Sequence, residues 1–346
     1  MHQINLLLHG MGNVNATLLT LLERQASLLQ QRHQLELRVV GAVDSQGGCW
    51  DERGLALTEL RHIKQRHGSV ARHPQGEASG DAMRLLSRAA TPLILIEATP
   101  VDLVDGGVGL SAMRRALRGG HAVVTANKAP LVLAFAELTA LARQQGVGLA
   151  YSATVCGGLP AINMGRYDLA HATVRRLEGI LNSTTHYLLT EMEAGNDYAT
   201  ALAEAQAAGI AETDPTLDVS GWDAANKLII LANSVLQQPT GMGDLAVAGI
   251  EGIRAETLRA ARADGYVIKL VASAEWRGEG YDLTVAPRKL PLSHPLTRLT
   301  GHEMGLWLET DINGDIFLSI REEDPTPTAA AMLRDIVLLA KGARAW

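Results

Sequence analysis

Carboxylates and one lysine gather in a short stretch of the chain, between Glu212 and Lys227. Asp223 and Lys227 lie four residues apart, so on a helix they share one face. Around Lys227, from Ala224 to Leu236, the residues are almost entirely apolar, which predicts a buried helix. Because a buried lysine is costly unless it is paired, we expect Asp223 to hold Lys227 in a closed site, where the amine could transfer a proton during carbonyl chemistry. A surface pair of little consequence is the alternative.

Other polar residues surround this helix in the sequence. Glu212 and Asp218 precede it and could hold a cationic ammonium group on a substrate. Ser220 could cap the helix. The polar cluster Asn182-Ser183-Thr184-Thr185 lies between apolar segments, where it could cap a helix or line a pocket.

A second lysine, Lys128, directly follows the apolar run Ala122 to Thr125. If that run is a strand of a parallel sheet, Lys128 lies at the carboxyl edge, where open α/β sheets bind ligands. A solvent-exposed lysine at the start of a helix is the alternative.

The first half of the chain alternates short apolar runs with helical patterns, which predicts an α/β fold with a Rossmann-type doubly wound parallel sheet over residues 1–150. The expected strands are residues 4–8, 35–43, 92–98, 121–125 and 148–152, and the expected helices are those ending near residue 33, 111–118 and 133–145. The polar segment 51–81 is expected to be a helix and a surface loop.

The second half, residues 151–326, predicts an α+β domain with a mixed or antiparallel sheet, because several of its segments alternate apolar and polar residues. Helices are expected over 186–209 and 222–236, and strands over 266–276, 281–287 and 306–321. A last helix, 327–346, is expected to pack back on the first domain.

The first turn between a strand and a helix contains a Gly-x-Gly pair, which favours dinucleotide binding. The backbone there can approach a pyrophosphate closely, and the helix N-terminus supplies N–H donors. The loop residues are Gly10, Met11, Gly12, Asn13, Val14 and Asn15. Asn15 stands where the usual fingerprint has a third glycine. Asp44 ends the second strand, where an acidic residue usually binds the ribose of NAD, although it could simply begin a turn.

Composition narrows the class of protein. The 346 residues carry a net charge of −6 and 4% aromatic residues, which argues against nucleic acid or an anionic membrane as a partner. The first residues lack the basic region typical of a signal peptide, and no apolar run approaches membrane-spanning length, so we expect a cytoplasmic enzyme. Two cysteines do not make a disulfide framework, and Cys156 is expected to be buried and inert rather than a nucleophile. His62, His67 and His73 are expected to face solvent rather than a metal.

Several segments, in order, resemble homoserine dehydrogenases. They are Gly10-x-Gly12-x-Val14, Glu97-Ala98-Thr99-Pro100, Thr125-Ala126-Asn127-Lys128, Gly179-Ile180-Leu181-Asn182-Ser183-Thr184-Thr185, the stretch from Glu212 to Lys227, and, more weakly, Leu290 to Gly301. The resemblance covers nearly the whole chain, and the Glu212–Lys227 stretch is its most specific part.

This resemblance implies interconversion of L-homoserine and L-aspartate 4-semialdehyde with NAD or NADP, in the route to threonine, methionine and isoleucine. It implies that Lys227 donates a proton to the carbonyl and that Lys128, between cofactor and substrate, assists. Glu212 and Asp223 would bind homoserine with Asp218 nearby, and the loop Gly10–Asn15 and Thr99 would contact the cofactor. The family is usually dimeric, so a homodimer is expected. The chain is too short for a fused kinase or a regulatory domain, so regulation by threonine through such a domain is not expected.

Three departures from the family pattern stand out. Asn15 replaces the third glycine, which could loosen cofactor binding. Ser152 stands where many members have a glutamate that binds sodium together with backbone carbonyls, here those of Val155, Gly157 and Leu159, so no metal is assigned. The segment from Arg321 to Pro327 is acidic rather than glycine-rich. Another dehydrogenase of an amino acid or semialdehyde, or a non-catalytic dinucleotide sensor, remain as alternatives.

Overall fold

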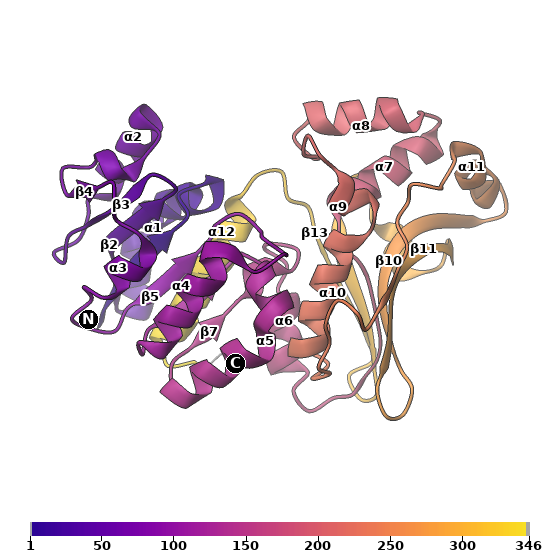
Figure 1. Cartoon of the computed structure of the whole chain (residues 1–346). Helices are drawn as coiled ribbons and strands as arrows, with labels where there is room; N and C mark the ends of the chain where they lie inside the picture. The colour runs from indigo at the N-terminus through magenta and orange to yellow at the C-terminus, as the bar shows by residue number, and fades with distance from the viewer. Residues whose placement is uncertain (1, 344–346) are drawn as a thin grey trace. The chain divides into compact units, whose positions relative to one another are not determined.

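A computed structural model describes residues 2–343, and the chain divides into two compact units (Figure 1). The first unit comprises the chain up to Gly158 together with the chain from Asp324 onward, and the second runs from Leu159 to Glu323. Among the described residues, no helix is both long and apolar enough to span a bilayer.

The first unit contains a sheet whose strands lie in the order β4-β3-β2-β1-β5-β6-β7. The parallel strands are β1 (His2–His9), β2 (Leu35–Asp44), β5 (Ile94–Glu97), β6 (Ala122–Thr125) and β7 (Leu149–Ala150). Leu6 to Leu8 in β1 are fully buried, as is typical of a central parallel strand. The predicted Rossmann-type sheet is thus confirmed.

Two short strands that the pattern did not predict extend one edge of this sheet. They are β3 (Gly47–Trp50), antiparallel to β2, and β4 (Gly76–Glu77), antiparallel to β3. The segment 51–81 otherwise holds the helix α2 (Leu57–His67) and the 3-10 turn η1 (Val70–Arg72). His62 and His67 are exposed, but His73 is buried, contrary to the expectation, because it lies where the chain turns back to form β4.

The remaining helices of the first unit follow the strands in the predicted alternation. They are α1 (Asn13–His33), α3 (Ala82–Leu86), α4 (Gly107–Arg118), α5 (Ala129–Gln145) and α12 (Thr326–Ala340), with a 3-10 turn η2 (Ser152–Thr154). Both α4 and α5 begin four residues earlier than predicted. Two glycines at the start of α4 and the apolar run with Pro130 at the start of α5 hide the helical period.

The last helix, α12, belongs to the first unit although 165 residues of the second unit precede it in the chain. Its apolar face, with Met332 and Ile336, joins the core that Leu18 and Leu22 of α1 help to form; Figure 1 shows α12 in yellow among indigo and magenta elements. A polar contact adds to this packing. Asp335, 1% exposed, accepts hydrogen bonds from Ser152 N at 2.9 Å and from Ser152 Oγ at 2.6 Å.

The second unit contains a mixed sheet with the strand order β13-β12-β8-β10-β11-β9. The strands are β8 (Val174–Ile180), β9 (Ala246–Val247), β10 (Tyr266–Trp276), β11 (Tyr281–Pro291), β12 (Met304–Thr310) and β13 (Asp315–Ile320), antiparallel except that β9 runs parallel to β11. The predicted mixed or antiparallel sheet is confirmed. The run 306–321 proves to be a hairpin rather than one strand, with a turn at Gly314 (φ +71°).

The helices of the second unit precede and follow these strands. They are α6 (Ala161–Asn163), the π-helical turn η3 (Met164–Asp168), α7 (Ser183–Ala194), α8 (Tyr198–Ala207), α9 (Thr216–Val219), α10 (Trp222–Ser234), α11 (Ala255–Ala263) and the 3-10 turn η4 (Pro295–Arg298). The predicted helix 186–209 is therefore two helices. Gly195, at φ +122°, ends α7, and Asp197 caps α8 by accepting a hydrogen bond from Thr200 N.

We expect Asp335→Ala to lower the free energy of unfolding by about 2–4 kcal/mol, because it removes both acceptors of a buried polar contact. Glu52→Ala is the control, since Glu52 is exposed and should matter little. Urea denaturation followed by circular dichroism measures both variants. Equal midpoints for Asp335→Ala and Glu52→Ala would contradict the stabilising role of this contact.

Candidate active site

The loop after β1 has the backbone that a phosphate-binding turn needs. Gly10 has φ +85°, and a Cβ there would lie 2.5 Å from Ala98 O, so no other residue fits without moving β5. A Cβ on Gly12, by contrast, would meet nothing within 4 Å. Gly12 is the N-cap of α1, with no side-chain cap and no acidic residue in the first turn. The first N–H groups of α1 therefore face open space, as anion binding requires.

The residues of this loop divide into two groups. Gly12 and Asn13 are exposed, whereas the side chain of Met11 is buried in the core with that of Leu18. Val14 also packs partly against this core. Contacts of Met11 with a dinucleotide would therefore involve its backbone rather than its side chain.

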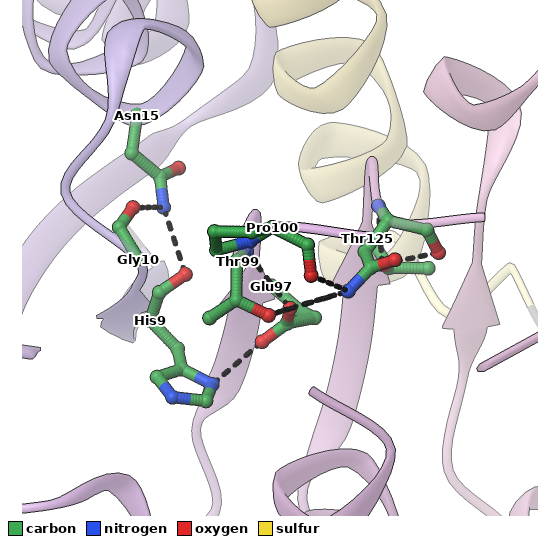
Figure 2. A network of polar contacts seen from close by, with 8 residues as sticks. His9, Gly10, Asn15, Glu97, Thr99, Pro100 and Thr125 are labelled. Atoms are coloured by element: carbon green, nitrogen blue, oxygen red, sulfur yellow. Dashed lines mark hydrogen bonds and ion pairs between the residues drawn. The ribbon is translucent and has the colours of Figure 1, made fainter. Parts of the chain in front are cut away.

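Asn15 binds the backbone of the loop through its side-chain amide. It is fully buried, and its Nδ2 donates to Gly10 O at 2.8 Å and to His9 O at 3.3 Å (Figure 2). A third glycine normally lets helix and strand pack closely; here a side chain fills the space and satisfies two carbonyl groups of the turn. The substitution thus replaces one way of holding the turn by another.

A buried polar network lies beside this loop, at the ends of β1, β5 and β6. His9 Nδ1 lies 2.6 Å from Glu97 Oε2, and Glu97 Oε1 accepts hydrogen bonds from Thr99 N at 2.9 Å and from the Thr99 hydroxyl. Figure 2 shows these side chains meeting between the strands. Asn127 Nδ2 donates to Glu97 Oε1 at 3.3 Å and to Thr99 Oγ1 at 3.2 Å. The predicted cofactor residue Thr99 therefore uses both of its donors inside the protein.

Lys128 follows Asn127 at the same edge of the sheet, as its position in the sequence predicts. Asn127 Oδ1 accepts a hydrogen bond from Ala129 N at 3.1 Å, which holds the start of α5 where Lys128 is the N-cap residue. Lys128 is half-buried.

Asp44 lies at the predicted end of β2, but its carboxylate is already engaged. Oδ1 accepts from Gln46 N and Ser69 Oγ, and Oδ2 accepts from Val70 N and from Lys64 Nζ at 2.8 Å. Burial alone would raise the pKa of this carboxyl group, but these hydrogen bonds, that from Lys64 first, hold its pKa below the usual value. With four donors bound, the carboxylate has little capacity left for ribose hydroxyls. The geometry favours the turn-forming interpretation of Asp44.

In the second unit, Asp223 and Lys227 form the buried pair that the sequence predicts on α10. Lys227 Nζ donates to Asp223 Oδ2 at 2.7 Å and to Leu181 O at 2.6 Å. The side chain of Lys227 is 14% exposed and that of Asp223 is 8% exposed. The helix start differs from the expectation. Gly221, at φ +85°, is the N-cap residue, and Ser220 ends the preceding α9.

Asn182 connects this pair to a second carboxylate. Its Nδ2 donates to Asp218 Oδ1 at 2.7 Å and to Asp223 Oδ2 at 2.8 Å, while its Oδ1 accepts from Thr185 N at 2.8 Å. The capping interpretation of the 182–185 cluster is confirmed, and the same Asn182 side chain also contacts the two carboxylates. Sequence reasoning named this cluster without assigning Asn182 a role, since its partners lie 36 and 41 residues away.

The surroundings of Asp218 shift the pKa of its carboxyl group. Burial and, next, the nearby charge of Asp223 raise its pKa, while hydrogen bonds from Thr184 and Asn182 oppose the rise. The positive charge of Lys227 also lowers the pKa of Asp218, but by less than these other effects. Glu212 lies on the exposed segment between α8 and α9.

The remaining sequence candidates contribute no chemistry that the structure reveals. Cys156 and Cys49 are buried, and burial raises the pKa of the Cys49 thiol to about 12. The hydroxyl of Ser152 donates to Asp335. Across residues 2–343 no group of three or more His, Cys, Asp or Glu residues is arranged to hold a metal ion.

A doubly wound sheet with a glycine phosphate loop, joined to a second unit that carries a buried Lys–Asp pair, defines a nicotinamide-dependent dehydrogenase class. Comparison with known proteins is more specific. The homoserine dehydrogenase family model matches residues 160–337. The homoserine dehydrogenase of Methanocaldococcus jannaschii is 34% identical over 96% of this chain and 98% of its own length. The NAD(+)-dependent homoserine dehydrogenase of Pseudomonas canavaninivorans is 33% identical over 99% and 98%.

Solved structures agree with these relatives. Homoserine dehydrogenase from Thermoplasma acidophilum superposes with a TM-score of 0.83 at 28% identity, covering 98% of this chain and 100% of that one. A hyperthermophilic archaeal homoserine dehydrogenase in complex with NADPH gives a TM-score of 0.84 at 25% identity, covering 99% of both chains. The chain belongs to the homoserine dehydrogenase family.

We expect Asn182→Ser to raise the pKa of Asp218 further. Serine keeps the cap on α7 but removes the amide hydrogens that stabilise the ionised carboxylates. The protonated form of Asp218 should then persist to higher pH, as measured by the pH titration of its carboxyl carbon in NMR spectra. Asn196→Ser, which removes a surface amide bonded to Glu191 at 3.0 Å, is the control. An Asp218 titration identical in both variants would refute the role of Asn182.

Proposed function

We propose that this protein catalyses the NAD(P)-dependent interconversion of L-homoserine and L-aspartate 4-semialdehyde. The observation that carries the proposal is the buried Asp223–Lys227 pair with Asn182 and Asp218 around it. A lysine in such a site can transfer a proton at a carbonyl oxygen. The membership of this chain in the homoserine dehydrogenase family supports the same reaction.

The residues of the second unit bind and orient the amino acid in this proposal. Asp218 and Glu212 bind the substrate ammonium group, because both carry carboxylate oxygens that can accept its hydrogen bonds. Asp223 orients the amine of Lys227, which gives a proton to the aldehyde oxygen during reduction and takes one from the alcohol during oxidation. Lys128 lies at the carboxyl edge of the first sheet, where open α/β sheets bind ligands, and the family resemblance assigns it an assisting role.

The first unit fits a nicotinamide dinucleotide. Open space above Gly12 and the bare N-terminus of α1 suit a pyrophosphate, so the loop Gly10–Asn15 would hold it. The Thr99 backbone and Lys128 would lie toward the nicotinamide end. When bound, NAD or NADP accepts or supplies the hydride. The domain roles follow as proposals, with cofactor binding by the first unit and catalysis and dimerisation by the second.

The biological setting is part of the same proposal. The reaction belongs to the route to threonine, methionine and isoleucine, and we infer a cytoplasmic homodimer. The two cysteines are free and buried, which suits a reducing compartment. Dimerisation follows from the resemblance to the family and is tested by light scattering.

Replacing the proposed proton donor tests the reaction directly. Lys227→Ala should lower kcat for homoserine oxidation by a factor on the order of 10²–10⁴ and leave NADH affinity nearly unchanged, because Lys227 lies on the other unit from the phosphate loop. Absorbance at 340 nm, the wavelength of reduced nicotinamide, measures turnover. Lys289→Ala, which removes a lysine bound to Asp264, is the control. A Lys227→Ala enzyme as fast as Lys289→Ala would refute the assignment, and wild-type protein that binds NADH but oxidises no homoserine would refute the function.

Cofactor choice depends on Lys64 in this arrangement. Because Lys64 neutralises Asp44, the end of β2 does not repel the 2′-phosphate of NADP as a free carboxylate would. Lys64→Met should therefore lower the ratio of kcat/KM with NADP to that with NAD by roughly tenfold. Parallel assays with the two cofactors measure the ratio, and Lys289→Met controls for the loss of a charge elsewhere. An unchanged ratio would show that Lys64 does not influence cofactor choice.

A further inference from the structure

The pair His9–Glu97 is the most deeply buried ionisable pair that the proposed mechanism leaves unused. His9 and Glu97 are 5% and 0% exposed, and they lie opposite each other on the adjacent parallel strands β1 and β5. Nδ1 of His9 faces the carboxylate at 2.6 Å. The two groups therefore form a close pair that is shielded from solvent.

Glu97 organises the ends of two neighbouring strands. Its Oε1 accepts from both donors of Thr99, just past β5, and from Asn127, just past β6. Asn127 also donates to Pro100 O at 3.4 Å. One carboxylate oxygen therefore determines the path of the chain at Thr99 and just before Lys128.

Such a carboxylate is in an unusual place. It belongs to the residue before Ala98, whose carbonyl oxygen packs directly beneath Gly10, in the loop proposed to hold a pyrophosphate. α4 packs closely against this network, because a Cβ on Gly109 would lie within 2.9 Å of Asn127 Nδ2, Glu97 Oε1 and Thr99 Oγ1. An unanswered negative charge here would both destabilise the fold and repel a dianionic ligand.

We propose that His9 and Glu97 are a positioning pair for the dinucleotide. Glu97 holds Thr99 and Asn127, and the Nδ1–H of His9 offsets the charge of Glu97 beneath the phosphate loop. The inference rests on the cofactor-binding part of the proposed function, and it assigns both residues a role through the loop and not through contact with the reacting atoms.

A double-mutant cycle tests the separate roles of His9 and Glu97. NADH affinity is measured by fluorescence and ADP-ribose affinity by calorimetry. His9→Leu removes the donor and should raise both dissociation constants tenfold or more, since the pyrophosphate is common to the two ligands. The double variant His9→Leu/Glu97→Gln also removes the charge, and it should recover most of that loss, because a Gln oxygen can still accept from Thr99 and Asn127. Glu137→Gln, in a surface pair with Arg114, is the matched control for loss of a carboxylate.

The outcomes separate positioning from packing. An equal loss of affinity in His9→Leu and in the double variant would mean that His9 only fills space, which would overturn the proposal. Wild-type affinity in His9→Leu would overturn it as well. If His9→Leu does not fold, recovery of folding in the double variant supports it. If neither folds, His9→Gln is measured instead, because its amide retains a hydrogen-bond donor. Its dissociation constants for NADH and ADP-ribose should rise by much less than tenfold, and a rise of tenfold or more overturns the proposal.

Because the measurement is binding, it is independent of turnover. Wild-type protein that binds NADH but does not oxidise homoserine would refute the proposed reaction while the cycle still decides the role of His9. Wild-type protein that binds neither NADH nor ADP-ribose would overturn this inference, because the inference requires dinucleotide binding.

Discussion

The second unit depends on satisfying one buried carboxylate, that of Asp223. Its Oδ2 receives Lys227 from the next turn of α10 and Asn182 from the start of α7. The amide can reach it only because β8 ends at Ile180 and the chain turns at once into α7. Gly221, at φ +85° between α9 and α10, lets Asp218 approach the same amide. A buried ion pair by itself adds little stability, so the arrangement is better understood as holding a lysine in one place.

In the first unit the polar side chains face inward and the backbone remains for the ligand. The carboxylate of Asp44 is bound by four donors, Thr99 gives both of its donors to Glu97, and the amide of Asn15 is bound to the turn. What remains open is the space at Gly12 and the N–H groups of α1. These side chains hold the turn in place, and in the proposed function the N-terminus of α1 supplies the attraction for phosphate.

The sequence predicted those features that depend on local periodicity. The parallel strands, the helix of Lys227 and the antiparallel strands β10 to β13 of the second sheet follow from spacing. β8 was missed because Arg175, Arg176 and Glu178 interrupt its apolar pattern, although it is central in its sheet. Glu178 is accommodated there by Arg288 and His294, which come from elements more than a hundred residues later. No local pattern contains that information.

The same limit applies to the candidate site, where each element missed from the sequence is a long-range polar contact. Asn182 binds carboxylates 36 and 41 residues away, and Ser152 binds Asp335 at a separation of 183 residues. Position 152 shows why this matters for inference from a family pattern. The hydroxyl does not leave the place without a carboxylate, because α12 brings Asp335 to it from the far end of the chain. The partner of Ser152 is supplied by a segment 183 residues away, which the local pattern around position 152 does not contain.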